Sequence, residues 1–312
     1  MVSSALRTNP LRGIFLKVSS VVVFTAMATC IKTVAGDVPP GQTVFFRAFF
    51  AMPVILIWLA ASGHLRDGLI TKNPMGHVWR GLVGTIAMAC GFTALGLLPL
   101  PEVTAIGYAS PLLVVIFAAM FLGEQVRAFR ITTVALGMVG VLIIVGPRLS
   151  IIGTSAMDAL QTLGVVITLA GATFAALAQI FVRKLITKES TPAIVFYFSL
   201  TATLMSLVTL PFGWVVPSVT HTTLLVLAGL AGGVGQILLT NSYRHADASV
   251  IAPFEYSSMI LALLIGFFMF GEAPTVSVLV GAAIVVTAGL LIIWRERQLG
   301  IERDKARRAM TP

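Results

Sequence analysis

Long apolar segments recur along the whole chain, and they restrict its fold more than any other feature. Each approaches the roughly 20 mostly apolar residues that a helix needs to cross a bilayer. Only 11% of the 312 residues are charged, whereas soluble domains carry about a quarter. We therefore predict an all-α membrane protein of ten transmembrane helices, at 13–34, 43–62, 78–97, 102–122, 129–146, 161–182, 192–213, 222–241, 248–270 and 275–294.

Basic residues are distributed unevenly between alternate loops, which predicts an orientation. If the N-terminus is cytoplasmic, all of the 21 lysines and arginines fall on the cytoplasmic side except Lys32, Arg47 and Arg148. This bias favours ten spans with both ends inside (N-in/C-in) and a basic cytoplasmic tail at 295–312. The net charge of +9 is then a topology signal, aided by anionic lipid, and no nucleic-acid partner is expected.

An internal repeat divides the chain into two halves, 13–147 and 159–294. A shift of 148 residues aligns Tyr108 with Tyr256, and it aligns two further pairs of motifs: Gly81-Leu82 with Gly229-Leu230, and Gly123-Glu124 with Gly271-Glu272. Because each half has five helices, the second half must enter the membrane from the opposite side. Inverted repeats of this kind are typical of secondary transporters, whose substrate sites lie where the halves meet.

Motifs of soluble enzymes are missing from the sequence. It contains no G-x-x-x-x-G-K-[ST], no H-E-x-x-H and no G-x-S-x-G. The four histidines sit in or beside loops and form no ligand cluster. We expect neither an enzyme nor a bound cofactor or metal, and any transport must be driven by a gradient. A lipid bilayer and a small-molecule substrate are the expected partners, and the sequence does not indicate an oligomeric state.

Ionisable side chains inside apolar segments are costly and are therefore the first candidates for function. Glu255 lies well inside the ninth segment, where it either accepts a proton or substrate group or is satisfied by a hydroxyl of Tyr256, Ser257 or Ser258. Arg47 either binds an anionic or carbonyl-rich substrate or extends to the surface. Lys32 is interpreted first as an interfacial anchor, and three glutamates at helix boundaries as solvated caps: Glu102, Glu124 and Glu272.

Aromatic and amide side chains complete the candidate site. Tyr108 and Tyr256 lie at equivalent depths of equivalent helices, so the repeat predicts that they approach one central cavity, for stacking on a planar ligand or for packing and gating. Phe24 and Phe254 extend this lining, unless they face lipid. Gln179 and Asn241 are expected to point inward because amides are costly in lipid, with hydrogen bonding between helices as their default role.

The stretch 97–108 (LLPLPEVTAIGY), followed by Pro111 and by Gly-Glu at 123–124, resembles the drug/metabolite transporter superfamily and its ten-helix EamA-domain branch. The resemblance returns at 248–272 and covers nearly the whole chain. Two further stretches are similar to the bacterial riboflavin transporter group: 38–47 and 74–81.

This resemblance implies a carrier in the bacterial inner membrane with a central cavity, working by alternating access, and most specifically riboflavin uptake. Tyr108, Tyr256, Arg47 and Glu255 offer the aromatic faces and polar partners that an isoalloxazine ring needs. The alternative is an exporter of amino acids or toxic metabolites, because an aromatic amino acid fits the same groups.

Overall fold

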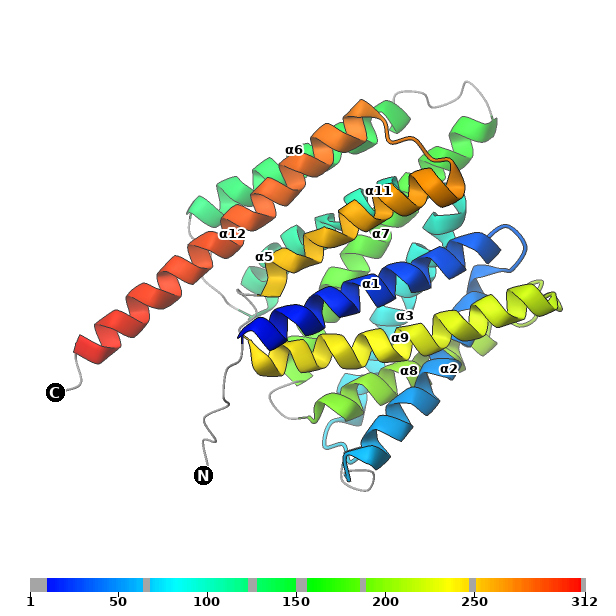
Figure 1. Cartoon of the computed structure of the whole chain (residues 1–312), viewed down its shortest axis with the longest axis horizontal. Coiled ribbons are helices and arrows are strands. Elements are labelled where there is room, and N and C mark those ends of the chain that lie inside the picture. Colours follow the sequence, from blue (N-terminus) through cyan, green and yellow to red (C-terminus); the bar gives the residue numbers. More distant parts are fainter. Residues whose placement is uncertain are drawn as a thin grey trace.

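The computed structural model describes residues 10–63, 68–122, 128–149, 156–185, 189–246 and 251–309, and these residues are helical apart from short connections (Figure 1). The first half holds α1 (Pro10–Val34), α2 (Pro40–Ala61), α3 (Pro74–Leu97), α4 (Leu100–Gly107), α5 (Ala109–Leu122) and α6 (Ala128–Leu149). The second half holds α7 (Ala156–Leu185), α8 (Thr191–Leu207), α9 (Val219–His245), the 3₁₀-helix η1 (Ala252–Tyr256), α11 (Ser257–Phe270) and α12 (Val276–Ala309).

Nine segments of this described part are long and apolar enough to cross a bilayer. The remaining predicted span corresponds to α8, which is apolar but shorter, at Pro192–Leu207. The sequence predicted that this span ends at residue 213, whereas the helix stops at Leu207 and turns follow as far as Gly213. Gly213 has a φ of 87°, which glycine adopts without strain. The all-α class and the ten apolar helical segments are confirmed. The side of the membrane that each end faces stays a prediction.

Two of the predicted spans are broken, and they break at the aligned tyrosines. The fourth span consists of α4 and α5, with Tyr108 at the junction, and the ninth consists of η1 and α11, with the junction after Tyr256. In the ninth span Pro253 stands at the start of the 3₁₀ turn, where its missing N–H is tolerated. The repeat seen in the sequence therefore extends to the backbone geometry.

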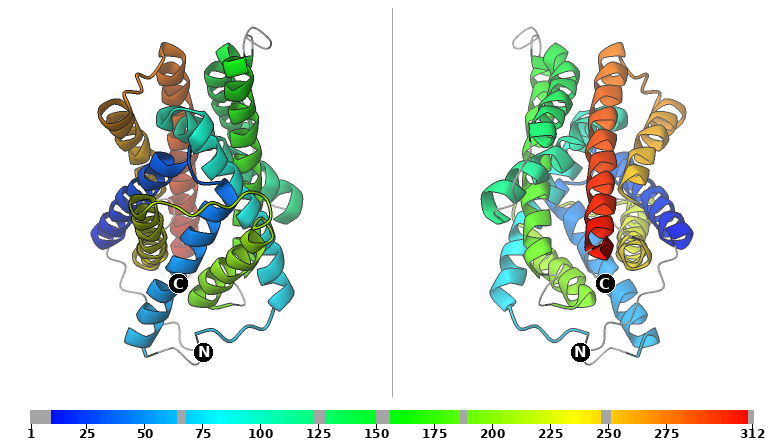
Figure 2. Two further views of the ribbon diagram at one scale, coloured as in Figure 1. Left: turned by 90° about the vertical axis from the view of Figure 1, so that its right-hand side faces the viewer. Right: turned by 90° about the vertical axis from the view of Figure 1, so that its left-hand side faces the viewer.

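Packing between the halves is reciprocal. The first helix of one half packs along the third helix of the other, as α1 on α9 and α7 on α3. The equivalent helices α2 and α8 pack on each other, and so do α6 and α12 (Figures 1 and 2). The largest buried apolar cluster joins both halves and includes Ile106, Leu112, Val165 and Val285. Neither half forms this cluster alone.

The first and the last helix show where the two ends of the described chain lie. The start of α1 and the end of α12 lie toward the same end, as an even number of crossings requires (Figure 1). The tail predicted at 295–312 continues α12 as helix to Ala309 and extends past its neighbours (Figure 1). From residue 296 onward, Gln298 has the single side chain that lies within the described residues.

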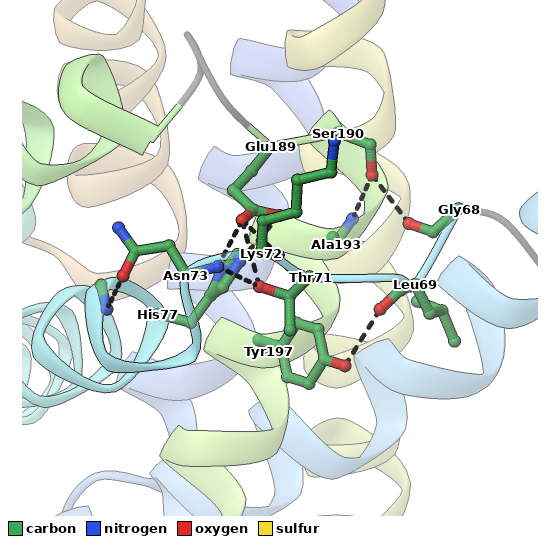
Figure 3. A network of polar contacts seen from close by, with 11 residues as sticks. Gly68, Leu69, Thr71, Lys72, Asn73, His77, Glu189, Ser190, Ala193 and Tyr197 are labelled. Atoms are coloured by element: carbon green, nitrogen blue, oxygen red, sulfur yellow. Dashed lines mark hydrogen bonds and ion pairs between the residues drawn. The ribbon is translucent and has the colours of Figure 1, made fainter.

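A buried carboxylate joins the segment before α3 to the start of α8 (Figure 3). Glu189 Oε1 accepts hydrogen bonds from the Thr71 hydroxyl at 3.1 Å and from the backbone N–H groups of Lys72 and Asn73, both at 2.8 Å. Its Oε2 lies 3.5 Å from Nε2 of His77. Next to it, the Ser190 hydroxyl donates to the Gly68 carbonyl at 2.7 Å. This network fixes the second and third helices of the first half against the second helix of the other half.

Candidate functional site

Tyr108 and Tyr256 lie against each other where the two broken spans meet. Their ring centroids are 5.0 Å apart and their planes are inclined by 70°, the edge-to-face arrangement that aromatic pairs prefer. The Tyr108 hydroxyl shares a 2.6 Å hydrogen bond with the hydroxyl of Ser258. The Tyr256 hydroxyl reaches α12, where a methyl group added to Gly289 would overlap it. The predicted meeting of the two tyrosines is therefore found between equivalent points of the two halves.

Glu255 lies beside this pair and forms an ion pair with Lys17 of α1. The Lys17 side chain is 3% exposed, whereas the Glu255 side chain is 49% exposed. The sequence placed Lys17 among the cytoplasmic charges and offered Glu255 a neighbouring hydroxyl. The hydroxyl alternative for Glu255 is wrong, because α1 starts at Pro10 and carries Lys17 into the bundle, against the start of the ninth span. The side of the membrane that Lys17 faces stays a prediction.

A second ion pair joins α1 to the other end of the ninth span. Lys32 Nζ lies 2.8 Å from Oε1 of Glu272 and donates to the carbonyls of Leu95 at 3.1 Å and Leu98 at 2.8 Å. Glu272 Oε2 accepts from the backbone N–H of Leu100 at 2.8 Å. Lys32 is thus no interfacial anchor and Glu272 no solvated cap. Carbonyls and an N–H left free at helix ends gather around this pair.

The other predicted glutamate caps differ in their outcome. Glu102 is buried, and its Oε1 lies 2.7 Å from Nη2 of Arg148. It is therefore an ion-pair partner and not a solvated cap, because α6 and α7 cover the start of α4. Glu124 lies outside the described residues. Since Lys32 and Arg148 are both paired, two of the three basic residues predicted on the outer side are neutralised within the bundle.

Arg47 is buried in α2 and does not reach the surface. Its guanidinium carbon lies 5.7 Å from the ring centroid of Phe198 in α8. The guanidinium of Arg80 in α3 lies over the same ring, at 4.0 Å. Two cationic side chains from the first half therefore converge on one aromatic ring of the second half.

The remaining candidates are dispersed. Phe24 packs against Gly235 of α9, and Phe254 is half-buried in η1. Asn241 is half-buried near the end of α9. Gln179 is exposed, so its predicted inward orientation is wrong. The packed face of α7 runs through Ala176 and Ile180 against α5, and this register turns Gln179 outward.

A cavity of about 160 Å³ opens beside the C-terminal end of α1, away from the tyrosines. Its lining is mainly apolar and includes Ile31, Thr43, Phe92 and Thr93. Sites for metabolites of drug size are usually about 300–1,000 Å³. The cavity is therefore too small to hold such a substrate in the conformation seen here, and it touches none of the predicted site residues.

Both halves of the chain match a known transporter family. The sequence profile of the EamA-like transporter family matches residues 11–146 and 162–294, one match in each half. The chain belongs to the EamA-like transporter family. One crystal structure has a similar fold, with a TM-score of 0.65 and 20% sequence identity. The match covers 91% of this chain and 97% of that one. At that identity the likeness concerns the fold alone.

Curated relatives of this EamA-like chain include an uptake transporter and an exporter, each named for its substrate. An S-adenosylmethionine uptake transporter of Rickettsia bellii is 28% identical over 82% of this chain and 84% of its own. The pseudopaline exporter CntI of Pseudomonas aeruginosa is 29% identical over 88% of this chain and 94% of its own. The chain is therefore a multi-pass membrane transporter of small metabolites with bacterial relatives, and it is not an enzyme. These relatives do not support the predicted riboflavin subgroup.

Sequence reasoning missed Lys17, Arg80 and Phe198 as parts of the site. Arg80 was counted as a cytoplasmic charge because the third segment was predicted to begin at residue 78. One local signal places it deeper: Asn73 caps the helix by accepting from the Gly76 N–H at 3.0 Å, and Pro74 follows as its first residue. That signature starts α3 a turn earlier. Nothing in the sequence singled out Phe198.

Proposed function

We propose that this EamA-like protein is a secondary transporter that moves a small amino-acid-derived metabolite by alternating access of the halves 13–147 and 159–294. One observation carries the proposal: α1 and the ninth span are tied by an ion pair at each end, with the tyrosine pair beside that interface. Lys17 and Lys32 are separated by about 22 Å along α1. Breaking the Lys32–Glu272 pair frees one end of the interface, and breaking Lys17–Glu255 frees the other.

S-adenosylmethionine is the first substrate candidate, because it is the substrate named for relatives that align over most of the chain. Its planar adenine ring suits the faces of Tyr108 and Tyr256, with Phe24 and Phe254 as further aromatic contacts. Its amino acid portion offers charges of both signs, which suits Arg47 and Glu255. Riboflavin remains the second candidate on the strength of the same aromatic pair, and tryptophan represents the amino-acid exporters.

The test is uptake into proteoliposomes that contain the purified chain. Labelled S-adenosylmethionine, riboflavin and tryptophan are supplied in turn, with and without a pH gradient, and empty liposomes give the background. We expect saturable S-adenosylmethionine uptake that an excess of unlabelled compound abolishes. Tyr256→Ala should lower this uptake about tenfold or more, since base–aromatic stacking contributes about 1–3 kcal/mol.

Phe212→Ala is the matched control, because Phe212 is 78% exposed in the turn after α8. Its uptake should equal that of the wild type. If riboflavin alone is taken up, S-adenosylmethionine is the wrong substrate, but the protein is still a transporter. If none of the three compounds enters above background although the protein is folded and inserted, the proposed substrate classes are wrong.

A further inference from the structure

Arg47 and Arg80 are unusual among the cations of the described chain. Both lie inside segments that are apolar enough to cross a membrane, Pro40–Ala61 and Pro74–Leu97. Nε of Arg47 and both Nε and Nη1 of Arg80 are buried and form no hydrogen bond with any described group. An unpaired charge held away from water is among the costliest features that a protein can keep.

Acidic side chains that might neutralise these arginines are engaged elsewhere. In the part of the chain whose side chains are described, each acid faces another base: Asp37 faces His221, Glu102 faces Arg148, Glu189 faces His77, Glu255 faces Lys17 and Glu272 faces Lys32. Among the described side chains, the Phe198 ring is the contact that both arginines share. A cation–π contact offsets only part of the cost of burying a guanidinium group, and two like charges on one ring add to that cost.

The surroundings of the arginines come from both halves. Arg47 and Arg80 belong to α2 and α3, whereas Phe198 belongs to α8 and Gly232 to α9. A methyl group at Gly232 would lie 3.0 Å from Nε of Arg47, and one at Gly84 would overlap Nη1 of Arg80. Bare backbone thus makes room for both guanidinium groups at a junction of the two halves.

We propose that Arg47 and Arg80 form a binding site for a carboxylate of the transported metabolite, closed in the conformation seen here. This inference rests on the proposed transport function and adds the chemical class of the substrate. A guanidinium group donates two parallel hydrogen bonds to a carboxylate, and the pair of charges on the Phe198 ring is matched by an anion. Binding there joins groups of both halves, so the anion supplies a contact that depends on how the halves are placed.

The test compares ligands that differ by the carboxylate alone. Binding of S-adenosylmethionine and decarboxylated S-adenosylmethionine, and of tryptophan and tryptamine, is measured by thermal unfolding of the purified full chain in nanodiscs. The variants are Arg47→Gln, Arg80→Gln and their lysine counterparts. Lys72→Gln is the charge-matched control, because Lys72 is exposed outside the spans.

We expect the wild type to bind at least one carboxylate compound about ten- to a hundredfold more tightly than its decarboxylated partner. Both glutamine variants should remove that preference, the lysine variants should restore part of it, and Lys72→Gln should keep it. Where a glutamine variant does not fold, its lysine counterpart provides the test, and it should prefer the carboxylate compound less strongly than the wild type does.

Equal binding of both members of each pair, or a preference that survives both glutamine variants, would overturn the carboxylate site. So would the absence of any shift with either carboxylate compound. These outcomes are separate from failure of the proposed function, because uptake of riboflavin, which has no carboxylate, would retain the transporter while overturning this site.

Discussion

At the scale of single residues, the position of Glu189 shows how one carboxylate replaces missing backbone partners. Its Oε1 accepts from Lys72 N–H and Asn73 N–H, groups at the start of α3 that have no partner within the helix. Burial alone raises the pKa of Glu189, but the hydrogen bonds from Lys72, Thr71 and Asn73 and the approach of His77 outweigh it, so that its pKa lies below the usual 4.5. The charged form is therefore the stabilising one.

This direction predicts a pH dependence of stability. A group whose pKa is lowered by folding stabilises the folded state above its unfolded pKa and loses that contribution as the pH falls through the folded pKa. Glu189→Gln should lower the free energy of unfolding by about 1–3 kcal/mol at pH 7. The difference from wild type should shrink below about pH 4.5. Thermal unfolding in detergent from pH 7 to pH 3.5 measures it.

Asp37→Asn is the control for this measurement, because the Asp37 side chain is 67% exposed and lies 3.6 Å from His221. It should change stability little at any pH in the series. A Glu189→Gln difference that stays constant as the pH falls would contradict the assigned role of the charge.

At the scale of elements, the crossing of α9 over α2 depends on glycines that allow the backbones to approach. A methyl group at Gly229 would lie 2.5 Å from Cβ of Phe50 and 2.8 Å from the carbonyl oxygen of Phe46. One at Gly233 would lie 3.1 Å from the carbonyl oxygen of Ala51. Small residues at such spacing are the usual means of close helix packing in membranes. Because backbone atoms form the obstacle, side-chain rotation cannot relieve it.

Gly229→Ala should therefore destabilise the protein by about 1–3 kcal/mol, as overpacking does. Gly91→Ala is the matched change in α3, where an added methyl group meets nothing within 4 Å. There the gain in helix propensity should leave stability unchanged or raise it by up to about 1 kcal/mol. Unfolding midpoints of the two variants in the same detergent give the comparison. Equal midpoints would mean that the α2–α9 crossing adjusts without cost.

At the scale of the whole molecule, reciprocal packing makes the two halves a single structure. Helices α1 and α7 each pack on the third helix of the other half, so each half is held against the other by its first helix. The orientation N-in/C-in remains a prediction from the loop charges. It assigns the turn before α9 to the outside and the start of α3 to the cytoplasm.

Cysteine accessibility tests that orientation. In a background with Cys30→Ala and Cys90→Ala, single cysteines replace Val216, which is 98% exposed, and Met75, which is 61% exposed. In intact cells a membrane-impermeant thiol reagent should label Val216→Cys, and it should label Met75→Cys only after the membrane is permeabilised. The reverse pattern would mean that both ends of the chain face the outside. Labelling of both cysteines in intact cells would contradict the ten-span arrangement.

The sequence by itself determined the helical segments, the family and the internal repeat. A bilayer demands apolar helices of a set length, so each segment is visible in its own residues. The contact of the aligned Tyr108 and Tyr256 followed from the repeat, whereas the breaks of two spans at these residues were not predicted. These features are local, or they arise from comparing one half with the other.

Only the tertiary structure decided which charges are neutralised. Lys17 and Glu255 are 238 residues apart, and their pairing depends on which faces of α1 and the ninth span meet. The rotation of each helix about its axis also decided that Gln179 faces outward. In the same way it brought Arg80 to the Phe198 ring, beside Arg47. The physical reason is that hydropathy reports how apolar a segment is, whereas the partner of a buried charge is set by the packing of helices distant in the sequence.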